Sequence, residues 1–364
     1  MRILQVVSLL SPDGAFGGPA RVAINQSAAL IRKGHDVTLA AGTRGYPIPP
    51  TDIGGVPLRL FPARTLLPGL GFPGMWVPGL IRWFDAHAGD FDVVHFHFGR
   101  DLMVLPVAAL ARRLRLPYVL QTHGMVIPSR NPLAGPLDTL WTRRLLADAR
   151  AVFYLTDLER TQLREVAHAE ITLAQLHNGV PDYPAGPERT GVTEVLCLAR
   201  LHARKRPTLF VAVAKQLLAE GLDARFTLVG PDEGEAAAVQ AAIGGETRIT
   251  WAGAIDPADA PSRLAKATAY VLAAEREPYP MAVLEAMSVG LPVVVCDDCG
   301  LAPTIAETRA GVVTKGTVSA LADAVRTVLA DPAGYGARAR TTARERFGMG
   351  AIADQLTASY GVRT

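Results

Sequence analysis

The sequence predicts an α/β protein with two doubly wound parallel sheets in tandem. Short apolar runs alternate with longer stretches of helical periodicity along nearly the whole chain, and this βαβ alternation is typical of parallel sheets. The alternation is interrupted at 181–192, where PDYPAGPERTGV is rich in Pro and Gly and reads as a linker. At about 150 residues per domain, a length of 364 residues also favours two domains.

The elements follow one another in the same order in both halves. The chain begins with the strand RILQVVSLL, a Gly-containing loop and a helix from Pro19 to Lys33. Pro19 suits the first turn of that helix, and Gly34 suits its C-terminal cap. Further strands are expected at 36–42, 91–98, 117–124, 151–156, 193–199, 225–230, 248–253, 269–274 and 292–296. Further helices are expected at 102–114, 137–149, 157–167, 207–220, 233–243, 257–267, 281–289, 319–329, 334–347 and 351–360.

These elements divide the chain into three parts. Residues 1–183 form the first expected domain, residues 184–345 form the second, and residues 346–364 carry the last helix. Ligands of doubly wound sheets bind beyond the carboxyl ends of the strands. Two such domains facing each other would therefore place a binding site in the cleft between them.

The composition excludes several classes of protein. Hydrophobic residues make up 49% and charged residues 20%, so a chain of this length can bury cores and is not disordered. The net charge of +3 is too small for a dedicated nucleic-acid binder. Three Cys are too few for a disulfide scaffold, and Cys296 and Cys299 lack the second ligand pair of a zinc site. A strand-end Cys and a turn Cys are expected, with a thioredoxin-like pair as the alternative.

Three stretches bear on the location of the protein. MRILQVVSLLSPDG has one Arg and a short apolar run, which is typical of a first strand rather than of a signal peptide. There is no run of 18 apolar residues, so no transmembrane helix is expected, and free thiols without an export signal favour the cytoplasm. The segment 65–89 is rich in aromatic residues, including Trp76 and Trp83. It either packs in the core or contacts the inner face of a membrane or a lipid-linked acceptor.

Lysine is scarce, since only five of the 37 basic residues are Lys. One of them, Lys205, lies with Arg200 in LARLHARKRP, directly after the expected strand 193–199. Both side chains would project from the carboxyl edge of the second sheet, where two cations suit an anionic group such as a diphosphate. A Lys there supplies a compact point charge. The alternative is a solvated basic loop.

Two helix starts are candidate anion sites as well. Gly17 and Gly18 follow the first strand, and Gly at this place lets backbone N–H groups approach a ligand at a helix N-terminus. An ordinary tight turn is the alternative. The loop after the first strand has neither the G-x-G-x-x-G nor the P-loop pattern, which disfavours a dehydrogenase or a kinase. Pro280 fits the first turn of a later helix and leaves the N–H groups of Met281 and Ala282 for phosphate oxygens.

Two carboxylates flank that later helix start. Glu277 follows the expected strand 269–274, and Glu285 lies about two turns into the helix. Because Glu277 precedes the helix, both side chains can line one cleft, and a carboxylate can accept two sugar hydroxyls at once. Glu285 taken alone would be interpreted as a surface helix residue.

The histidines and one acidic pair offer weaker signals. His123 in QTHG ends a strand and can hydrogen-bond a ligand at the same edge of the sheet. His95 and His97 alternate along one strand, but no third metal ligand is evident, so no metal is expected there. Asp90 and Asp92 form a D-x-D before a strand rather than after it, which favours a solvated turn.

Taken together, these motifs resemble glycosyltransferase family 4, the retaining enzymes of GT-B fold. The resemblance rests on GGPARVAINQSAALIRKGHDVTLAAG, DVVHFH, THG, HNGV, ARLHARKRP, FTLVGPDEG and EPYPMAVLEAMSVGLPVVV, which span nearly the whole chain. The last of these resembles the E-x7-E element of the family and is the most specific. RERFGMGAIADQLTASY resembles the C-terminal helix that crosses back to the first domain.

The resemblance implies two Rossmann-like domains, an acceptor-binding one first and a nucleotide-sugar-binding one second. Glu277 would contact the donor sugar and Glu285 the ribose, while Arg200 and Lys205 would neutralise the diphosphate. The remaining contacts to the donor would come from His123, Gly17, Gly18, Gly230, Pro280, Met281 and Ala282. Transfer would retain the anomeric configuration without a metal or cofactor, from a UDP or GDP sugar to a glycan or lipid-linked acceptor in polysaccharide or glycoconjugate synthesis.

The sequence departs from the family pattern at one place. Where E-G-F-G is common, this chain has Glu277-Pro278-Tyr279-Pro280, so two backbone N–H donors are missing. The departure affects the details of donor contact and the identity of the donor. Two other functions stay open: a GT-B phosphorylase or sugar-phosphate synthase with a soluble acceptor, and a non-catalytic sugar-nucleotide-binding protein. The joint presence of Arg200, Lys205, Glu277 and Glu285 disfavours the latter.

Overall fold

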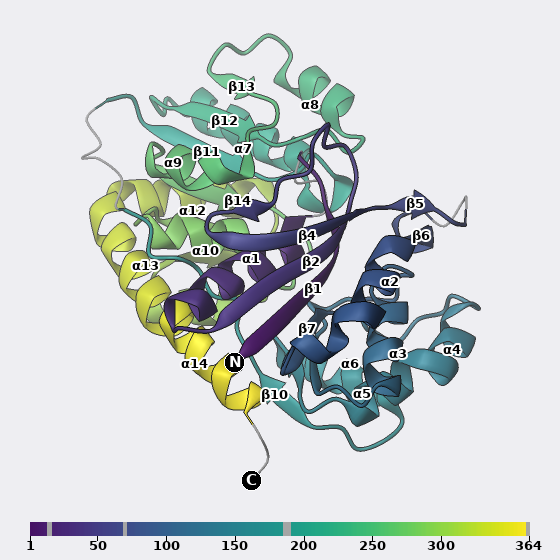
Figure 1. Ribbon diagram of the computed structural model, residues 1–364. Helices are drawn as coiled ribbons and strands as arrows, with labels where there is room; N and C mark the ends of the chain where they lie inside the picture. Colours follow the sequence, from purple (N-terminus) through teal and green to yellow (C-terminus); the bar gives the residue numbers. More distant parts are fainter. Residues whose placement is uncertain (13–16, 68–70, 185–190, 362–364) are drawn as a thin grey trace. The chain divides into compact units, whose positions relative to one another are not determined.

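The computed structural model describes residues 1–12, 17–67, 71–184 and 191–361 (Figure 1). The chain divides into two compact units, Met1–Gly179 together with Met349–Thr364, and Val180–Gly348. The sequence-based boundaries were 183/184 and 345/346. Half of the expected linker 181–192, residues 185–190, lies outside the described residues.

The first unit contains an eight-stranded sheet in the order β10-β9-β8-β7-β1-β2-β4-β3. All neighbours pair in parallel except β3 and β4, which are antiparallel. The strands are β1 Arg2–Leu10, β2 Asp36–Thr43, β3 Asp52–Ile53, β4 Val56–Pro62, β7 Val93–His97, β8 Tyr118–Gln121, β9 Val152–Tyr154 and β10 Leu173–Gln175. From β1 the strands are added on one side as β2 and β4, and the later strands β7 to β10 are added on the other side. The order of the strands therefore reverses beside the central strand β1, between β2 and β7.

The helices of this unit cover the two faces of its sheet. They are α1 Gly17–Arg32, α2 Pro78–His87, α3 Leu105–Arg113, α4 Ala134–Leu137, α5 Arg143–Asp148, α6 Asp157–Ala167 and α14 Met349–Tyr360. A π-helical turn, Asp138–Thr142, joins α4 to α5. A separate two-stranded ribbon pairs β5 Arg64–Thr65 with β6 Met75–Trp76.

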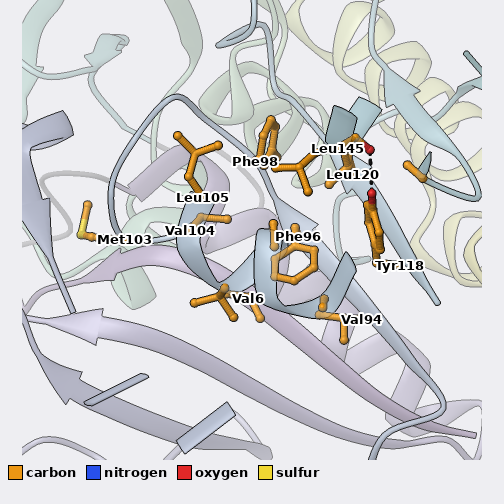
Figure 2. Close-up of a cluster of buried hydrophobic side chains, with 14 of the residues drawn as sticks. Val6, Val94, Phe96, Phe98, Met103, Val104, Leu105, Tyr118, Leu120 and Leu145 are labelled. Carbon is orange, nitrogen blue, oxygen red and sulfur yellow. Dashed lines mark hydrogen bonds between the residues drawn. The ribbon is translucent and has the colours of Figure 1, made fainter. Parts of the chain in front are cut away.

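One face of this sheet carries the larger core (Figure 2). Val94 and Phe96 of β7 point to this face because alternate residues of a strand face the same side. They pack against α3 and the turn before it, and Tyr118 donates a hydrogen bond from its hydroxyl to the carbonyl of Leu145 at 2.8 Å. Val93, His95 and His97 consequently project to the opposite face.

The opposite face is covered by α1 and by the C-terminal helix α14. Met349, Ile352, Ala353, Leu356 and Tyr360 pack with strand residues such as Ile3 and Val93. Gly179 permits this approach, since a Cβ there would lie 2.3 Å from the Met349 sulfur. The predicted return of the last helix to the first domain is confirmed.

The second unit contains a six-stranded parallel sheet in the order β13-β12-β11-β14-β15-β16. Its strands are β11 Glu194–Leu198, β12 Arg225–Val229, β13 Ile249–Trp251, β14 Ala269–Leu272, β15 Val293–Cys296 and β16 Gly311–Thr314. Its helices are α7 Pro207–Ala219, α8 Ala236–Ile243, α9 Ala260–Ala265, α10 Met281–Ser288, α11 Ala302–Thr308, α12 Val318–Ala330 and α13 Pro332–Phe347. The order of the strands in this sheet reverses beside β11, which lies between β12 and β14. The predicted fold class, two doubly wound α/β units, is confirmed.

Several short elements were not predicted from the sequence. β4 reads VPLRLFP, and its two Pro residues argue against a strand because Pro cannot donate to the ladder. β16 has only four residues, GVVT, and β10 only three. In the sheets these strands pair with β2, β15 and β9, respectively.

The aromatic segment 65–89 packs largely into the first unit. Leu80 and Phe84 of α2 are fully buried, and Trp83 stacks on His87 and lies against Phe61 and Phe91. Leu66 and Leu67 are exposed, while residues 68–70 are outside the described part. Within the described ranges, no helix combines the length and the apolarity needed to cross a bilayer.

Candidate functional site

A close ion pair occupies the switch point of the second sheet. Lys205 lies in the short 3₁₀ helix Ala203–Lys205 that follows β11, and Glu277 follows the adjacent strand β14. The Lys205 Nζ is 2.5 Å from Glu277 Oε2, and the side chains are only 13% and 10% exposed. The two residues come from the strands beside which the order of the sheet reverses, which is where doubly wound sheets bind ligands.

Neighbouring groups hold these two loops together. The Arg204 guanidinium lies 3.6 Å from the same carboxylate oxygen. The N–H of Glu275 donates to the carbonyl of Arg204 at 2.9 Å. Glu277 therefore meets two cations of one loop, and a backbone hydrogen bond fixes the spacing.

The Glu277 loop is also braced from the far side. The N–H of Arg276 donates to Asp298 at 2.8 Å, and the N–H of Gly300 donates to the Glu277 carbonyl at 2.9 Å. A Cβ at position 300 would lie 1.8 Å from the Pro278 carbonyl oxygen, so the loops approach closely only because residue 300 is Gly. Hydrogen bonds to Asp298 and Gly300 therefore hold the loop that carries the Glu277 side chain.

Arg200 pairs with a carboxylate of its own. Its guanidinium lies 2.6 Å from Glu233 Oε1, and the Arg200 side chain is 41% exposed. The two predicted cations of the diphosphate site thus each hold a carboxylate.

Glu285 is buried in α10, with 5% of its surface exposed, so the alternative of a surface helix residue is wrong. Burial raises the pKa of Tyr270 well above its ordinary value, and the nearby Cys197, Glu277 and Glu285 raise it further. Both carboxylates therefore act on one phenol, whose hydroxyl donates to the Leu198 carbonyl at 3.0 Å. Glu277 and Glu285 thus have one neighbour in common, Tyr270.

The start of α10 differs slightly from the prediction. Pro280 is the N-cap rather than part of the first turn, and Met281 and Ala282 are the first two helical residues. The Val283 N–H donates to the Pro280 carbonyl at 3.1 Å. Because Met281 and Ala282 lie in the first turn of α10, their N–H groups have no acceptor within the helix. Both residues are half-buried.

Gly230 has a structural reason to be Gly. Its N–H donates to the Gly253 carbonyl at 2.8 Å, and its carbonyl accepts from Trp251 Nε1 at 3.0 Å. With φ at 150°, a Cβ would lie 2.0 Å from the Ala199 carbonyl oxygen. The residue thus lets the ends of β11 and β12 approach each other.

In the first unit, His123 occupies a tight turn after β8. The Met125 N–H donates to the Thr122 carbonyl at 2.8 Å, and φ is +51° at His123 and +73° at Gly124. Positive φ at both central residues is typical of a type I′ turn and is rare for a residue with a side chain. The residue as a whole is half-buried, and burial of the imidazole lowers its pKa to about 3.

Glu159 supports this turn and was not identified from the sequence. Its carboxylate accepts from the Thr122 hydroxyl and from the Gly124 N–H, each at 2.5 Å, and from the Leu155 N–H at 2.7 Å. The available signal was the capping box T-x-x-E at 156–159, in which the Thr156 hydroxyl accepts from the Glu159 N–H. The Glu side chain serves the His123 turn as well as the helix start.

The remaining candidate residues of the first unit are two glycines at the start of α1 and two histidines of β7. Gly17 and Gly18 begin α1, while residues 13–16 of the preceding loop lie outside the described part. His95 and His97 are fully buried, and each has a ring nitrogen within hydrogen-bond distance of a protein side chain. In the described part of the chain, no group of three His, Cys, Asp or Glu could hold a metal.

The D-x-D stands at the amino edge of the first sheet. Asp92 accepts from the backbone N–H of Arg2 at 2.7 Å and from its guanidinium at 2.9 Å. These contacts lower the pKa of Asp92. Asp90 and Asp92 are exposed and precede β7, at the edge opposite to His123.

The two units repeat one strand order. β4-β2-β1-β7-β8-β9 in the first corresponds to β13-β12-β11-β14-β15-β16 in the second. This duplication, with the last helix returned to the first unit, is the architecture of the GT-B glycosyltransferases.

Comparison with known proteins agrees with this class. Residues 17–179 match the glycosyl transferase 4-like domain, and residues 184–346 match the glycosyl transferases group 1. The chain belongs to glycosyltransferase family 4 and is a glycosyltransferase. The alpha-D-kanosaminyltransferase of Streptomyces kanamyceticus is 26% identical over 336 residues, which cover 83% of this chain and 87% of that protein.

Solved structures show the same fold. Sucrose-phosphate synthase from Thermosynechococcus elongatus superposes with a TM-score of 0.76 at 21% identity, covering 99% of this chain and 98% of that one. HepE from Anabaena, solved in complex with UDP and glucose, has a TM-score of 0.74 at 19% identity and covers 98% of each chain.

Proposed function

We propose that this glycosyltransferase moves a sugar from a nucleoside-diphosphate sugar to a hydroxyl group of a glycan or lipid-linked acceptor, in polysaccharide or glycoconjugate synthesis. The second unit binds the donor and the first unit the acceptor. The observation that carries the proposal is the Lys205–Glu277 pair at the switch point of the second sheet, next to the start of α10.

The pair suits a donor that carries both a diphosphate and a sugar. When the diphosphate arrives, Lys205 exchanges its carboxylate for phosphate oxygens, which frees Glu277 to accept hydroxyl groups of the sugar. Arg200 makes the same exchange from Glu233. The largely buried position of the pair strengthens both interactions, because less water screens the charges.

The backbone completes the donor site. The N–H groups of Met281 and Ala282 lie at the positive end of the α10 dipole and donate to the diphosphate or the sugar. The buried Glu285 accepts from the ribose hydroxyls. Gly17 and Gly18, which have no side chains, allow the start of α1 to approach the phosphates.

The reaction proceeds with retention and without a metal. The bond between the anomeric carbon and the diphosphate oxygen breaks while the acceptor oxygen attacks the same face of the sugar. The acceptor proton passes to the departing phosphate oxygen, so no nucleophile from the protein is required. Lys205 and Arg200 stabilise the negative charge that develops on the leaving group.

The base of the donor is uracil or guanine. The UDP-bound state of HepE supports a uridine nucleotide at this fold. Pro278 and Pro280 lack the N–H groups that Gly would offer, so sugar contacts in this loop rely on the Glu277 carboxylate. The choice among hexoses therefore depends on that carboxylate and on His123.

A thermal-shift panel with UDP, GDP, ADP and TDP and their sugars tests the donor site. A ligand at 100 times its Kd stabilises the folded state by about 2.7 kcal/mol, which is a readily measured change in Tm. We expect a shift with UDP or GDP sugars, and no shift with any of them would contradict the assignment. Transfer should persist in EDTA, and NMR of the product should show the anomeric configuration of the donor.

A further inference from the structure

Three imidazoles stack in a row inside the first unit. The ring centroids of His95 and His97 are 4.7 Å apart, and those of His97 and His123 are 5.0 Å apart, with rings within 10° of parallel. Burial lowers the pKa of all three, to about 3 for His95 and His123. Each ring is therefore neutral near pH 7 and carries one N–H and one lone pair.

Hydrogen bonds link two of these rings to Gln5 of β1. The Nε2 of His97 lies 2.8 Å from Gln5 Oε1, and the Nδ1 of His97 lies 2.8 Å from the Nε2 of His123. Because an amide oxygen only accepts, His97 carries its proton on Nε2 and a lone pair on Nδ1. His123 must then donate from its Nε2, which leaves its own lone pair on Nδ1.

Tyr360 of α14 is hydrogen-bonded to the nitrogen end of the Gln5 amide. The Gln5 amide nitrogen donates to the Tyr360 hydroxyl at 3.4 Å, and that hydroxyl lies 2.6 Å from His95 Nδ1. Burial keeps the hydroxyl protonated, since it raises the pKa of Tyr360 well above its ordinary value. If the Gln5 amide faced the other way, each proton in the chain would move and His123 would offer an N–H instead of a lone pair.

We propose that Gln5 and His97 are positioning residues that hold His123 as the Nε2–H tautomer, so that Nδ1 of His123 only accepts. Among the residues that the structure describes, none is hydrogen-bonded to this nitrogen. An accepting nitrogen selects a hydroxyl group of the substrate and disfavours a carboxylate or phosphate oxygen at the same place. This role rests on the proposed function, in which His123 faces the sugar.

Nitrogen NMR of the unliganded full chain, with ¹⁵N-labelled histidine, measures the tautomer directly. His123→Asn and His97→Asn variants identify the two sets of signals among the eight His of the chain. We expect protonated Nε2 and unprotonated Nδ1 at both residues. A protonated Nδ1 at His123 would overturn the inference.

Two variants test where the preference originates. Gln5→Met removes the acceptor, and Tyr360→Phe removes the hydroxyl to which the Gln5 amide nitrogen donates. Each should give a mixture of tautomers at His123 and raise the donor KM about five- to tenfold, the size expected for one neutral hydrogen bond. Gln26→Met is the matched control, because Gln26 is equally buried and bonds Gln121 instead. An unchanged tautomer in a folded Gln5→Met protein would refute the role of Gln5.

NMR measures the tautomer without any substrate. The result can therefore contradict this inference without contradicting the proposed function, and the reverse also holds. Absence of transfer with every donor would contradict the proposed function and leave the measured tautomer standing. A transferase that is active with His123 protonated on Nδ1 would keep the function and overturn this inference.

Discussion

Lys205 and Glu277 are 72 residues apart in sequence, yet their charged atoms lie 2.5 Å apart where the order of the second sheet reverses. The contact joins the loops after two neighbouring parallel strands, β11 and β14. In the function that we propose, this cation and this carboxylate separate, and they contact the diphosphate and the sugar of the donor. The pair is therefore the first target for mutagenesis.

Lys205→Ala should abolish transfer while the protein stays folded, because the remaining Arg204 lies 3.6 Å from the carboxylate and supplies no compact charge at the diphosphate. Initial rates and circular dichroism check both parts. Lys215→Ala, which removes an exposed Lys from α7, is the control and should behave as wild type. Wild-type turnover in Lys205→Ala would exclude the diphosphate role.

A double-mutant cycle separates stability from chemistry at this pair. Removing one partner of a buried ion pair leaves a charge without its counterpart, so Lys205→Met and Glu277→Gln should each be less stable than wild type. The combined variant should be more stable than the sum of the two effects predicts, yet remain inactive. Urea unfolding gives the coupling energy, and strict additivity would contradict the interaction.

Glu159→Gln should weaken the His123 turn. The amide cannot accept with both of its polar atoms, so one of the buried donors at Thr122, Gly124 or Leu155 loses its acceptor, at a cost of about 1–3 kcal/mol. The donor KM should rise as His123 loses its fixed position. Glu165→Gln, on an exposed site of the same helix, is the control. Equal unfolding midpoints and equal KM values for both variants would rule out the supporting role.

The buried imidazoles predict acid sensitivity. Burial lowers the pKa of His95 and His123 to about 3, whereas an unfolded His titrates near 6.5. Between those values the unfolded state binds protons that the folded state does not. The free energy of unfolding should therefore fall as the pH falls from about 6.5 to about 3, by at most about 1.4 kcal/mol per pH unit for each ring.

Urea unfolding at pH 7 and pH 5 measures this dependence. His123→Gln should reduce the loss of stability between the two values, because one group that gains a proton on unfolding is absent. An identical loss in wild type and variant would mean that the ring is protonated in the folded state.

We propose that the exposed part of the segment 65–89 contacts a membrane. This contact depends on Leu66 and Leu67, which are exposed. It does not depend on Trp83, because that side chain packs against the core. We expect Leu66→Ser combined with Leu67→Ser to float less with anionic liposomes than wild type does. Ile48→Ser changes an apolar side chain of the same unit that is 85% exposed and should have no effect. Equal flotation of all three proteins would assign the segment to packing alone.

Many of the elements could be predicted from the sequence because their signals are local. Runs such as VLCL and YVL have the length and composition of buried parallel strands, and Pro280 marked a helix start to within one residue. β4 and β16 were missed because their stability comes from pairing rather than from their own sequence. Glu159 was missed because the three donors it accepts from are contributed by two different stretches of chain.

By itself, the sequence determined the alternation of strands and helices, the number of units and the residue types at the ends of β11 and β14, because these follow from periodicity and composition. Only the tertiary structure decided which residues meet. It paired Lys205 with Glu277 and Arg200 with Glu233, buried Glu285, and placed Gln5, His97, His123 and Tyr360 in one hydrogen-bonded row. Strand order decides such contacts between distant segments, and no local pattern encodes that order.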